Sequence, residues 1–304
     1  MKTVLITGAS GYIGQHSIPF LLKRGYSVHA LSREKRESTG EVHWHAADLL
    51  NPRDISCVVK EIKPTHLLHF AWYVEHGQFW DSERNLDWVK ASLTLFQEFL
   101  ASGGQRALFA GSCAEYDWNE GICREEMTPC KPTTLYGICK NSLWEIVRQI
   151  AKQKKISVSW GRIFHLYGEK EAPGRFIPSL IKGLMLGQSV PCTHGNKVRD
   201  FMCVVDAASA FAALLDSQVE GAVNIASGIP ITLKAVALEL ANILGKKDLI
   251  QFGALSAPKH DPAQILADVA RLQNEVGWKS CSDLKNGLTQ TIEWWQNQIL
   301  KANE

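Results

Sequence analysis

The stretch Val4-Leu5-Ile6-Thr7-Gly8-Ala9-Ser10-Gly11-Tyr12-Ile13-Gly14 decides the fold of this chain. Its apolar, β-branched first part ends at Thr7, as expected of a buried parallel strand. Three glycines follow at the spacing GxxGxxG, and apolar residues then continue at helical spacing from Ile18 to Leu22. In such a turn the first glycine permits a tight bend, the second lets backbone approach a pyrophosphate, and the third lets helix pack on strand. The stretch therefore predicts an α/β dinucleotide-binding fold.

The glycine spacing also carries a family resemblance. The sequence TGASGYIG, residues 7–14, resembles the short-chain dehydrogenase/reductase superfamily, particularly its extended branch. The resemblance implies a doubly wound parallel sheet, the Rossmann fold, with a smaller C-terminal substrate lobe. The helix N-terminus would present free N–H groups to the cofactor phosphates. The cofactor contacts expected from this turn are Gly8, Ser10, Gly11, Tyr12, Ile13 and Gly14.

Length and composition restrict the class of protein. A chain of 304 residues is long for one compact core, which favours one large domain with a smaller lobe. With 21% charged residues and a net charge of +2, the sequence shows no extended basic surface for nucleic acid. No apolar run has the length of a membrane span, and the eight cysteines lack zinc-like spacing. We expect a cytoplasmic enzyme with reduced cysteines and no metal site.

The residues after the second predicted strand bear on cofactor choice. An acidic residue at the end of this strand, Tyr26–Ser32, would bond the ribose 2′-OH of NAD and repel a 2′-phosphate. The chain instead has Ser32 and Arg33, followed by further basic residues. A guanidinium can hold a phosphate with two hydrogen bonds, so NADP(H) is favoured over NAD(H). A basic surface turn is the alternative, since acidic residues alternate with the basic ones.

Two further strand ends are expected beside the cofactor. The third strand leads into Asp48 and Leu49. By resemblance, Asp48 bonds the adenine amino group; its alternative role is a helix cap. The fourth strand, His66–Ala71, resembles the HxAA turn of the family, which implies that Ala71 and Trp72 pass the cofactor phosphates or ribose.

Three residues form a candidate catalytic set. Ser112 ends the fifth predicted strand, and ligands of open α/β sheets bind outside such strand ends. Tyr136 and Lys140 follow Pro132, so we expect them to open a new helix and to share one face of it. There the ammonium is expected to lower the pKa of the phenol. Together they resemble the Ser/Tyr/Lys set of the extended dehydrogenase/reductases, in which the Tyr and Lys also contact the cofactor.

Two later motifs point to the substrate. Residues 160–168 resemble the RxxNxYG motif of the family, with His165 at the substrate-contacting Asn position. This His either bonds the substrate or is a buried structural residue. Residues 198–206 match the RDFxxVxD motif of nucleotide-sugar enzymes, which implies that Arg199 binds the substrate diphosphate. The alternative for Arg199 is a salt bridge to Asp200 or another carboxylate.

The two positions after Ser112 distinguish a dehydratase from other enzymes of this branch. Sugar 4,6-dehydratases of this branch carry an Asp-Glu pair there, because eliminating water needs a base and an acid. This chain has Cys113 and Ala114 instead. Cys113 could be a base only as a thiolate, a minority form near neutral pH. We expect Cys113 to contact the substrate without driving dehydration.

The complete interpretation is a cofactor domain, residues 1–168 plus 202–228, and a substrate lobe, residues 169–201 plus 229–304. The predicted reaction is NADPH-dependent reduction of a nucleoside-diphosphate 4-keto-6-deoxy sugar. The alternatives are an epimerase or dehydratase with retained NAD(P), and a non-catalytic sensor that binds NADP. The family resemblance also suits a homodimer through the helices near 85–100 and 136–151.

Overall fold

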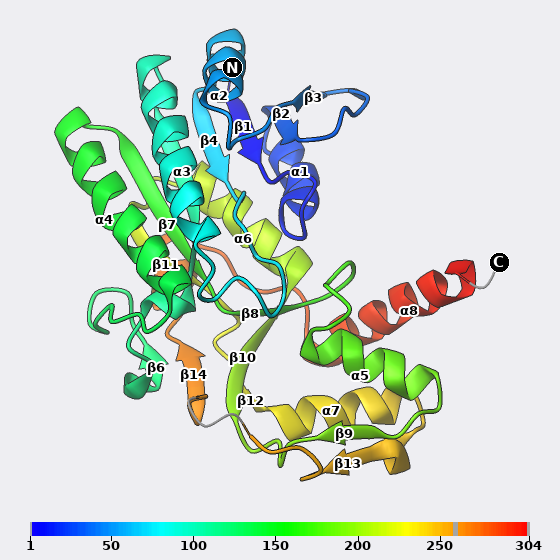
Figure 1. Ribbon diagram of the computed structural model, residues 1–304. Helices are drawn as coiled ribbons and strands as arrows, with labels where there is room; N and C mark the ends of the chain where they lie inside the picture. The colour runs from blue at the N-terminus through cyan, green and yellow to red at the C-terminus, as the bar shows by residue number, and fades with distance from the viewer. Residues whose placement is uncertain (1, 258–260, 303–304) are drawn as a thin grey trace.

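The computed structural model describes residues 2–257 and 261–302. Its larger part is a seven-stranded parallel sheet with the order β11-β7-β5-β4-β1-β2-β3 (Figure 1). The strands are β1 (Lys2–Thr7), β2 (Tyr26–Ser32), β3 (Val42–Ala46), β4 (His66–His69), β5 (Arg106–Ser112), β7 (Ser157–Ile163) and β11 (Gly221–Ile225). The predicted doubly wound fold is confirmed.

Helices cover both faces of this sheet. The helices α2 (Pro52–Ile62), α3 (Arg84–Ala101) and α4 (Leu135–Lys154) pack on one face, and α1 (Gly14–Lys23) and α6 (Val204–Asp216) on the other (Figure 1). Because both faces are covered, strands such as β4 and β5 consist almost wholly of buried residues. Residues 229–304 are expected from the sequence to lie in the lobe. Two of them, Leu272 and Trp278, instead pack in the core of the larger part, with residues of the sheet, α1 and α6.

The order of the strands fixes where a ligand can enter. The chain runs from β1 outward to β2 and β3, and then crosses back so that β4 lies on the other side of β1. This reversal leaves a crevice outside the carboxyl ends of β1 and β4, the usual ligand site of such sheets. The glycine turn after β1 lies at this crevice.

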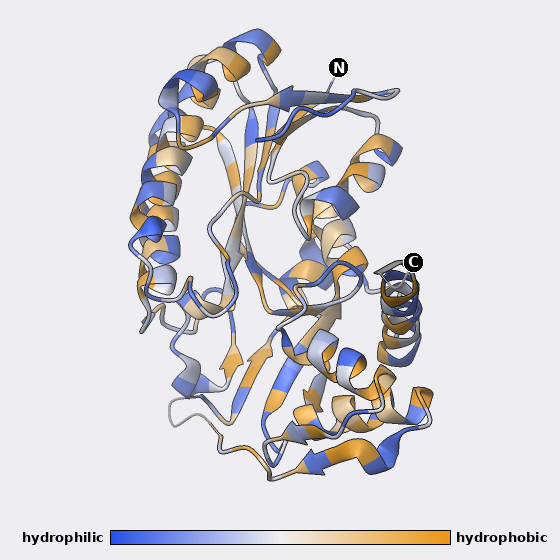
Figure 2. Cartoon of the chain, turned by 45° about the vertical axis from the view of Figure 1, so that its right-hand side comes forward, coloured by the Kyte–Doolittle hydropathy of each residue, from blue (hydrophilic) through white to orange (hydrophobic). Residues whose placement is uncertain are grey.

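The smaller part is a mixed α/β lobe below these strand ends (Figure 1). Its main sheet contains β6 (Ile122–Cys123), β8 (His165–Tyr167), β10 (Val198–Cys203), β12 (Pro230–Thr232) and β14 (Gln264–Ala267). A second pair joins β9 (Val190–Cys192) to β13 (Ile250–Phe252), beside α5 (Phe176–Met185), α7 (Leu233–Ile243) and α8 (Leu284–Ala302). In Figure 2 the lobe is the lower part of the molecule, with hydrophobic stretches along its strands and helices.

The connections make the lobe discontinuous in sequence. The chain first contributes β6 to the lobe, enters it again after β7 through β8 and α5, and returns to the large sheet at α6 and β11. The chain then crosses into the lobe again at β12. Within the described residues, no helix combines the length and the apolarity that crossing a membrane requires.

Candidate functional site

The glycine turn is built for close contacts. Gly8 has a φ of +65°, and a Cβ atom there would lie 2.8 Å from the amide nitrogen of Ala71. A Cβ at Gly14 would overlap the carbonyl of Gly8, so the helix can approach the strand only without a side chain. No side chain caps the start of α1, and Ser10 and Gly11 are exposed there. The turn and the helix start thus leave N–H groups available to an anion.

Tyr12 and Ala71 flank this turn at the carboxyl ends of the strands. The hydroxyl of Tyr12 is buried and has no hydrogen-bond partner among the described residues. The amide of Ala71 donates to the side-chain oxygen of Thr7 at 3.3 Å, which ties the end of β4 to the end of β1. A buried hydroxyl without a partner at this crevice fits a bound ligand that supplies one.

The end of β2 is polar and open. Ser32 accepts a hydrogen bond from the amide of Glu34 at 3.2 Å, and Arg33 is exposed. The guanidinium of Arg36 lies over the ring of Trp44, 5.0 Å from its centroid. The residues around an open hollow at this edge are Lys35, Arg36, Glu37, Ser38 and Trp44. The hollow therefore carries two cations, although Arg33 itself does not line it.

Asp48 and Leu49 follow β3. One carboxylate oxygen of Asp48 accepts the amide of Leu50 at 3.0 Å, which tightens the turn, and Leu49 is buried. The cap of α2 is Asn51, whose side chain accepts the amide of Arg53. Asp48 is thus a turn residue, and the helix cap lies three positions later.

The three candidate catalytic residues meet at the end of β5. The side chain of Thr134 caps α4, which begins at Leu135. Tyr136 and Lys140 are therefore both helical and lie on the buried face of α4. The amide of Tyr136 donates to the carbonyl of Trp80 at 2.8 Å, and the Ser112 side chain lies near enough to the phenol to lower its pKa. The ammonium of Lys140 donates to the carbonyl of Ala110 at 2.8 Å. The structure therefore brings together all three residues predicted from spacing.

The electrostatics of the pair differ from the expectation. Burial raises the pKa of the Tyr136 phenol, and the nearby Ser112 side chain only partly offsets this effect. Burial also lowers the pKa of Lys140 to about 7, against a smaller opposing effect of Glu115. The predicted lowering of the Tyr136 pKa is wrong, because burial has the largest effect and raises this pKa. The phenol lies among aromatic rings: Phe79 and Trp80 pack edge-on against it at 4.9 and 5.8 Å between centroids. The phenol of Tyr136 is therefore protonated at neutral pH.

Glu115 is a residue that the sequence interpretation left without a role. Its side chain is fully buried and accepts the amide of Ser112 at 2.7 Å. It also accepts the indole N–H of Trp160 at 2.9 Å and pairs with Arg162 at 2.7 Å. The signal in the sequence was the S-x-x-E pattern of a capping box, Ser112 to Glu115, at the start of a short 3₁₀ turn (Cys113–Glu115). Glu115 points away from the crevice and fixes the backbone of Ser112.

Cys113 lies in the small core beside the site. It is 8% exposed, and burial raises the pKa of its thiol. A buried thiol of raised pKa is not a base at neutral pH. All eight cysteines are free, and the described residues include no group of His, Cys, Asp or Glu side chains able to hold a metal ion.

His165 and Arg199 lie on adjacent strands, β8 and β10. Burial, followed by the charge of Arg199, lowers the pKa of His165 to about 3, so the ring is neutral. Its Nδ1 atom is buried without a hydrogen-bond partner among the described residues. Arg199 is buried and paired with Asp261, which also binds Lys197 at 2.6 Å. Arg199 thus makes a salt bridge to a carboxylate other than Asp200, one of the alternatives that the sequence left open.

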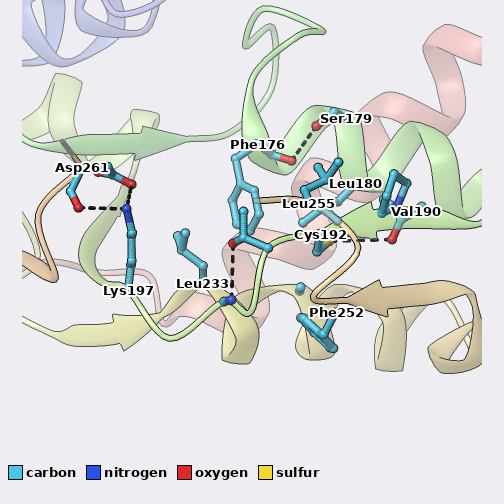
Figure 3. Close-up of a pocket in the computed structure, with 14 residues that line it drawn as sticks. Phe176, Ser179, Leu180, Val190, Cys192, Lys197, Leu233, Phe252, Leu255 and Asp261 are labelled. Carbon is cyan, nitrogen blue, oxygen red and sulfur yellow. Dashed lines mark hydrogen bonds and ion pairs between the residues drawn. The ribbon is translucent and has the colours of Figure 1, made fainter. Parts of the chain in front are cut away.

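A cavity of about 290 Å³ opens in the lobe next to these cations. Its walls are largely apolar and come from α5, α7, β9 and β13, and Lys197 and Asp261 lie at one side (Figure 3). The lining includes Phe176, Leu180, Val190, Cys192, Leu233, Phe252 and Leu255. The sequence interpretation did not find this cavity, because its walls come from segments that are far apart in the chain. The cavity therefore has apolar walls with a paired lysine and aspartate at one side.

Comparison with known proteins agrees with this geometry. A family model, the NAD dependent epimerase/dehydratase family, matches residues 4–226. The chain is 28% identical over 310 residues to a CDP-abequose synthase of Salmonella typhimurium, covering 95% of this chain and 97% of the relative. It is 26% identical over 302 residues to a UDP-glucose 4-epimerase of Corynebacterium glutamicum, covering 90% of each chain.

Among solved structures, a UDP-N-acetylglucosamine 4-epimerase from Methanobrevibacter ruminantium superposes with a TM-score of 0.87 at 22% identity, covering 98% of this chain and 99% of that one. The UDP-glucose 4-epimerase of Thermus thermophilus, solved with NAD, superposes with a TM-score of 0.82 at 24% identity. The match covers 97% of this chain and 99% of that one. These likenesses show the same fold. By the family match across most of its length, the chain belongs to the NAD dependent epimerase/dehydratase family and is an enzyme of that family.

Proposed function

We propose that the protein is an NADPH-dependent reductase of a nucleoside-diphosphate 4-keto-6-deoxy sugar. The observation that carries the proposal is the cluster of Ser112, Tyr136 and Lys140 at the crevice, with Tyr136 protonated and neither Cys113 nor Ala114 able to serve as an acid–base pair. The named relatives act on or make nucleotide sugars, which supports this substrate class. An epimerase or dehydratase that retains NAD(P) is the alternative.

The residues at the crevice fit a dinucleotide. The three glycines let the turn and the start of α1 pack directly on backbone, and the start of α1 offers uncapped N–H groups to a pyrophosphate. Asp48 has a second carboxylate oxygen for the adenine, and Lys140 has N–H bonds left for a ribose hydroxyl. When bound, the cofactor supplies a hydride to the carbonyl carbon.

The protein residues handle the oxygen of the reacting carbonyl. As negative charge develops there, the Tyr136 phenol gives its proton to that oxygen, and the Ser112 hydroxyl donates a hydrogen bond to it. The hydride and this proton together convert the ketone to an alcohol. Glu115 holds the amide of Ser112 and so keeps the hydroxyl in place.

The rest of the substrate would extend into the lobe. We propose that the nucleotide base of the substrate occupies the apolar cavity and that the diphosphate lies near Lys197 and Arg199. Without substrate, both cations pair with Asp261. His165 lies beside Arg199 with a free ring nitrogen, available to a sugar hydroxyl or a phosphate oxygen. Guanidinium and ammonium are suitable groups for a diphosphate.

The cofactor preference is testable at Arg33. Arg33→Asp should weaken NADPH binding by more than NADH binding, because it replaces an exposed cation near the ribose by a charge that repels a 2′-phosphate. Fluorescence titration of both nucleotides into wild type and variant measures the difference. Tighter binding of NADH than of NADPH by wild type would rule out the preference.

The reaction is testable in heavy water. Incubation with an intact nucleoside-diphosphate hexose should give no 4-keto-6-deoxy product, because Cys113 is a buried thiol and Ala114 has no titratable group. Incubation with a nucleoside-diphosphate 4-keto-6-deoxyhexose and NADPH should oxidise NADPH, with no deuterium entering C3 or C5 of the sugar. A 4-keto-6-deoxy product in the first mixture would establish a dehydratase instead.

We also propose a homodimer in the cytoplasm. The helices α3 and α4 lie side by side and expose Leu86, Ile138 and Ile146 by 47, 45 and 40%. Exposed apolar residues grouped on neighbouring helices are typical of an interface. Light scattering after size-exclusion chromatography should give a mass of two chains, and Ile138→Glu should give one.

A further inference from the structure

The ammonium of Lys140 lies in a nearly dry site with few partners. Lys140 is 3% exposed, and its only hydrogen bond to a described residue goes to the carbonyl of Ala110. The ring centroid of Trp72 lies 3.8 Å from the ammonium nitrogen. Since an ammonium has three N–H bonds and desolvation disfavours its charge, the indole face replaces a second polar partner.

The indole ring is itself held in place. Its N–H donates to the side-chain oxygen of Asn85 at 2.8 Å, and Asn85 is fully buried. The amide group of Asn85 donates in turn to the carbonyls of Phe79 and Ser82 at 2.7 and 2.8 Å. Trp72 therefore cannot turn away from Lys140 without breaking a buried hydrogen bond.

This arrangement links both members of the catalytic pair. Trp72 also packs edge-on against Tyr136, at 6.4 Å between centroids. Phe79, whose carbonyl oxygen accepts a hydrogen bond from Asn85, also packs edge-on against Tyr136, at 4.9 Å between centroids. We propose that Trp72 is a positioning residue that keeps the Lys140 ammonium charged and next to Tyr136, with Asn85 fixing the indole ring. The proposal rests on the proposed role of Lys140 in the reaction.

The consequence is a dependence on pH. The pKa of Lys140 is about 7, so a modest change in its surroundings alters its charge near neutral pH. Glu115 raises this pKa. His69 also faces Lys140, but burial lowers its own pKa to about 3 and it stays neutral, bonded to Thr7 and Ser92.

Removing the indole face should therefore lower the pKa of Lys140. Trp72→Leu is expected to lower it by about one unit, because a desolvated cation–π contact favours the charged form by an amount of that order. Activity that needs the ammonium is lost as pH rises through this pKa, so the alkaline limb of kcat/KM should move to lower pH. Trp72→Phe keeps a ring and should retain much of the wild-type profile.

The decisive measurement is independent of turnover. Carbon-13 NMR of the lysine ε-carbons, with the Lys140 signal identified by its loss in Lys140→Met, reports the pKa in full-length protein. Fluorinated tryptophans introduced at position 72 weaken the negative ring face and keep its shape, so they test the contact even where Trp72→Leu does not fold. The pKa should fall stepwise with the number of fluorine atoms.

A matched control is available in Trp88. This half-buried ring belongs to the same hydrophobic cluster as Trp72, with 6.5 Å between the two ring centroids. It forms no cation–π contact with Lys140. Trp88→Leu should leave the pKa of Lys140 unchanged. An unchanged pKa with the fluorinated rings, or an equal shift in Trp88→Leu, would overturn the proposal. A shifted pKa in a protein that does not reduce the keto sugar would sustain it and refute the proposed reaction.

Discussion

Tyr136→Phe is expected to lower kcat by about 10² or more while cofactor binding is kept, because the change removes only the hydroxyl proposed as the proton donor. The ring stays in its aromatic surroundings, and Lys140 keeps its bond to Ala110. Steady-state reduction of the keto sugar measures kcat, and quenching of protein fluorescence measures NADPH binding. The effect belongs to kcat, since proton donation is needed in the transition state and not for binding.

A second tyrosine provides the control for this experiment. Tyr26 is also buried and its hydroxyl donates to Asp216 at 3.1 Å, but it lies at the opposite end of the strands from the crevice. Tyr26→Phe should leave kcat unchanged. Nearly full activity of Tyr136→Phe would show that the chemistry assigned to this residue is wrong.

The largest expected effect on stability comes from the buried carboxylate beneath Ser112. Glu115→Ala should lower the free energy of unfolding by about 3–5 kcal/mol, because it leaves the Arg162 guanidinium buried without its charged partner. Arg162 is 2% exposed, and it also lies over the ring of Tyr116 at 4.5 Å. Urea unfolding followed by circular dichroism measures the difference.

A surface pair gives the matched comparison. Lys90 and Asp87 pair at 3.4 Å on α3 with side chains that are 77 and 58% exposed. Asp87→Ala should change the free energy of unfolding by about 0–1 kcal/mol, as exposed pairs do. Substituting both Glu115→Gln and Arg162→Met should recover much of the loss, since no lone charge remains buried. Equal losses of unfolding free energy from Glu115→Ala and Asp87→Ala would contradict the role of Glu115 as the partner of a buried charge.

The features that local sequence determines were predictable. The strand, the glycine turn and the helix occupy residues 2–23 without interruption, so their spacing alone indicated the crevice. The i, i+4 spacing of Tyr136 and Lys140 placed both on one helical face, and the end of β5 placed Ser112 beside them. These relations depend on the periodicity of one or two neighbouring elements.

The remaining features depend on contacts between distant segments. Arg199 meets Asp261 from another part of the lobe, and the walls of the lobe cavity come from four elements. The direction of the Tyr136 pKa depends on rings from the 72–80 segment, which sequence spacing does not place next to α4. Glu115 was visible as a capping pattern, but its ion pair with Arg162 required the register of β5 and β7.

The return of the chain to the large sheet has a consequence for synthesis on the ribosome. The outer edge of β7 pairs with β11, which follows it by about 60 residues, a length that takes roughly 3–12 s to translate at ~5–20 residues per second. During that interval a nascent chain exposes an unpaired strand edge, a surface prone to pairing with other chains. Fragments that end after β7 should therefore aggregate, whereas fragments that end after β11 possess the complete sheet. The proposed catalytic residues all precede β7, but the sheet that positions them is complete only once β11 has emerged.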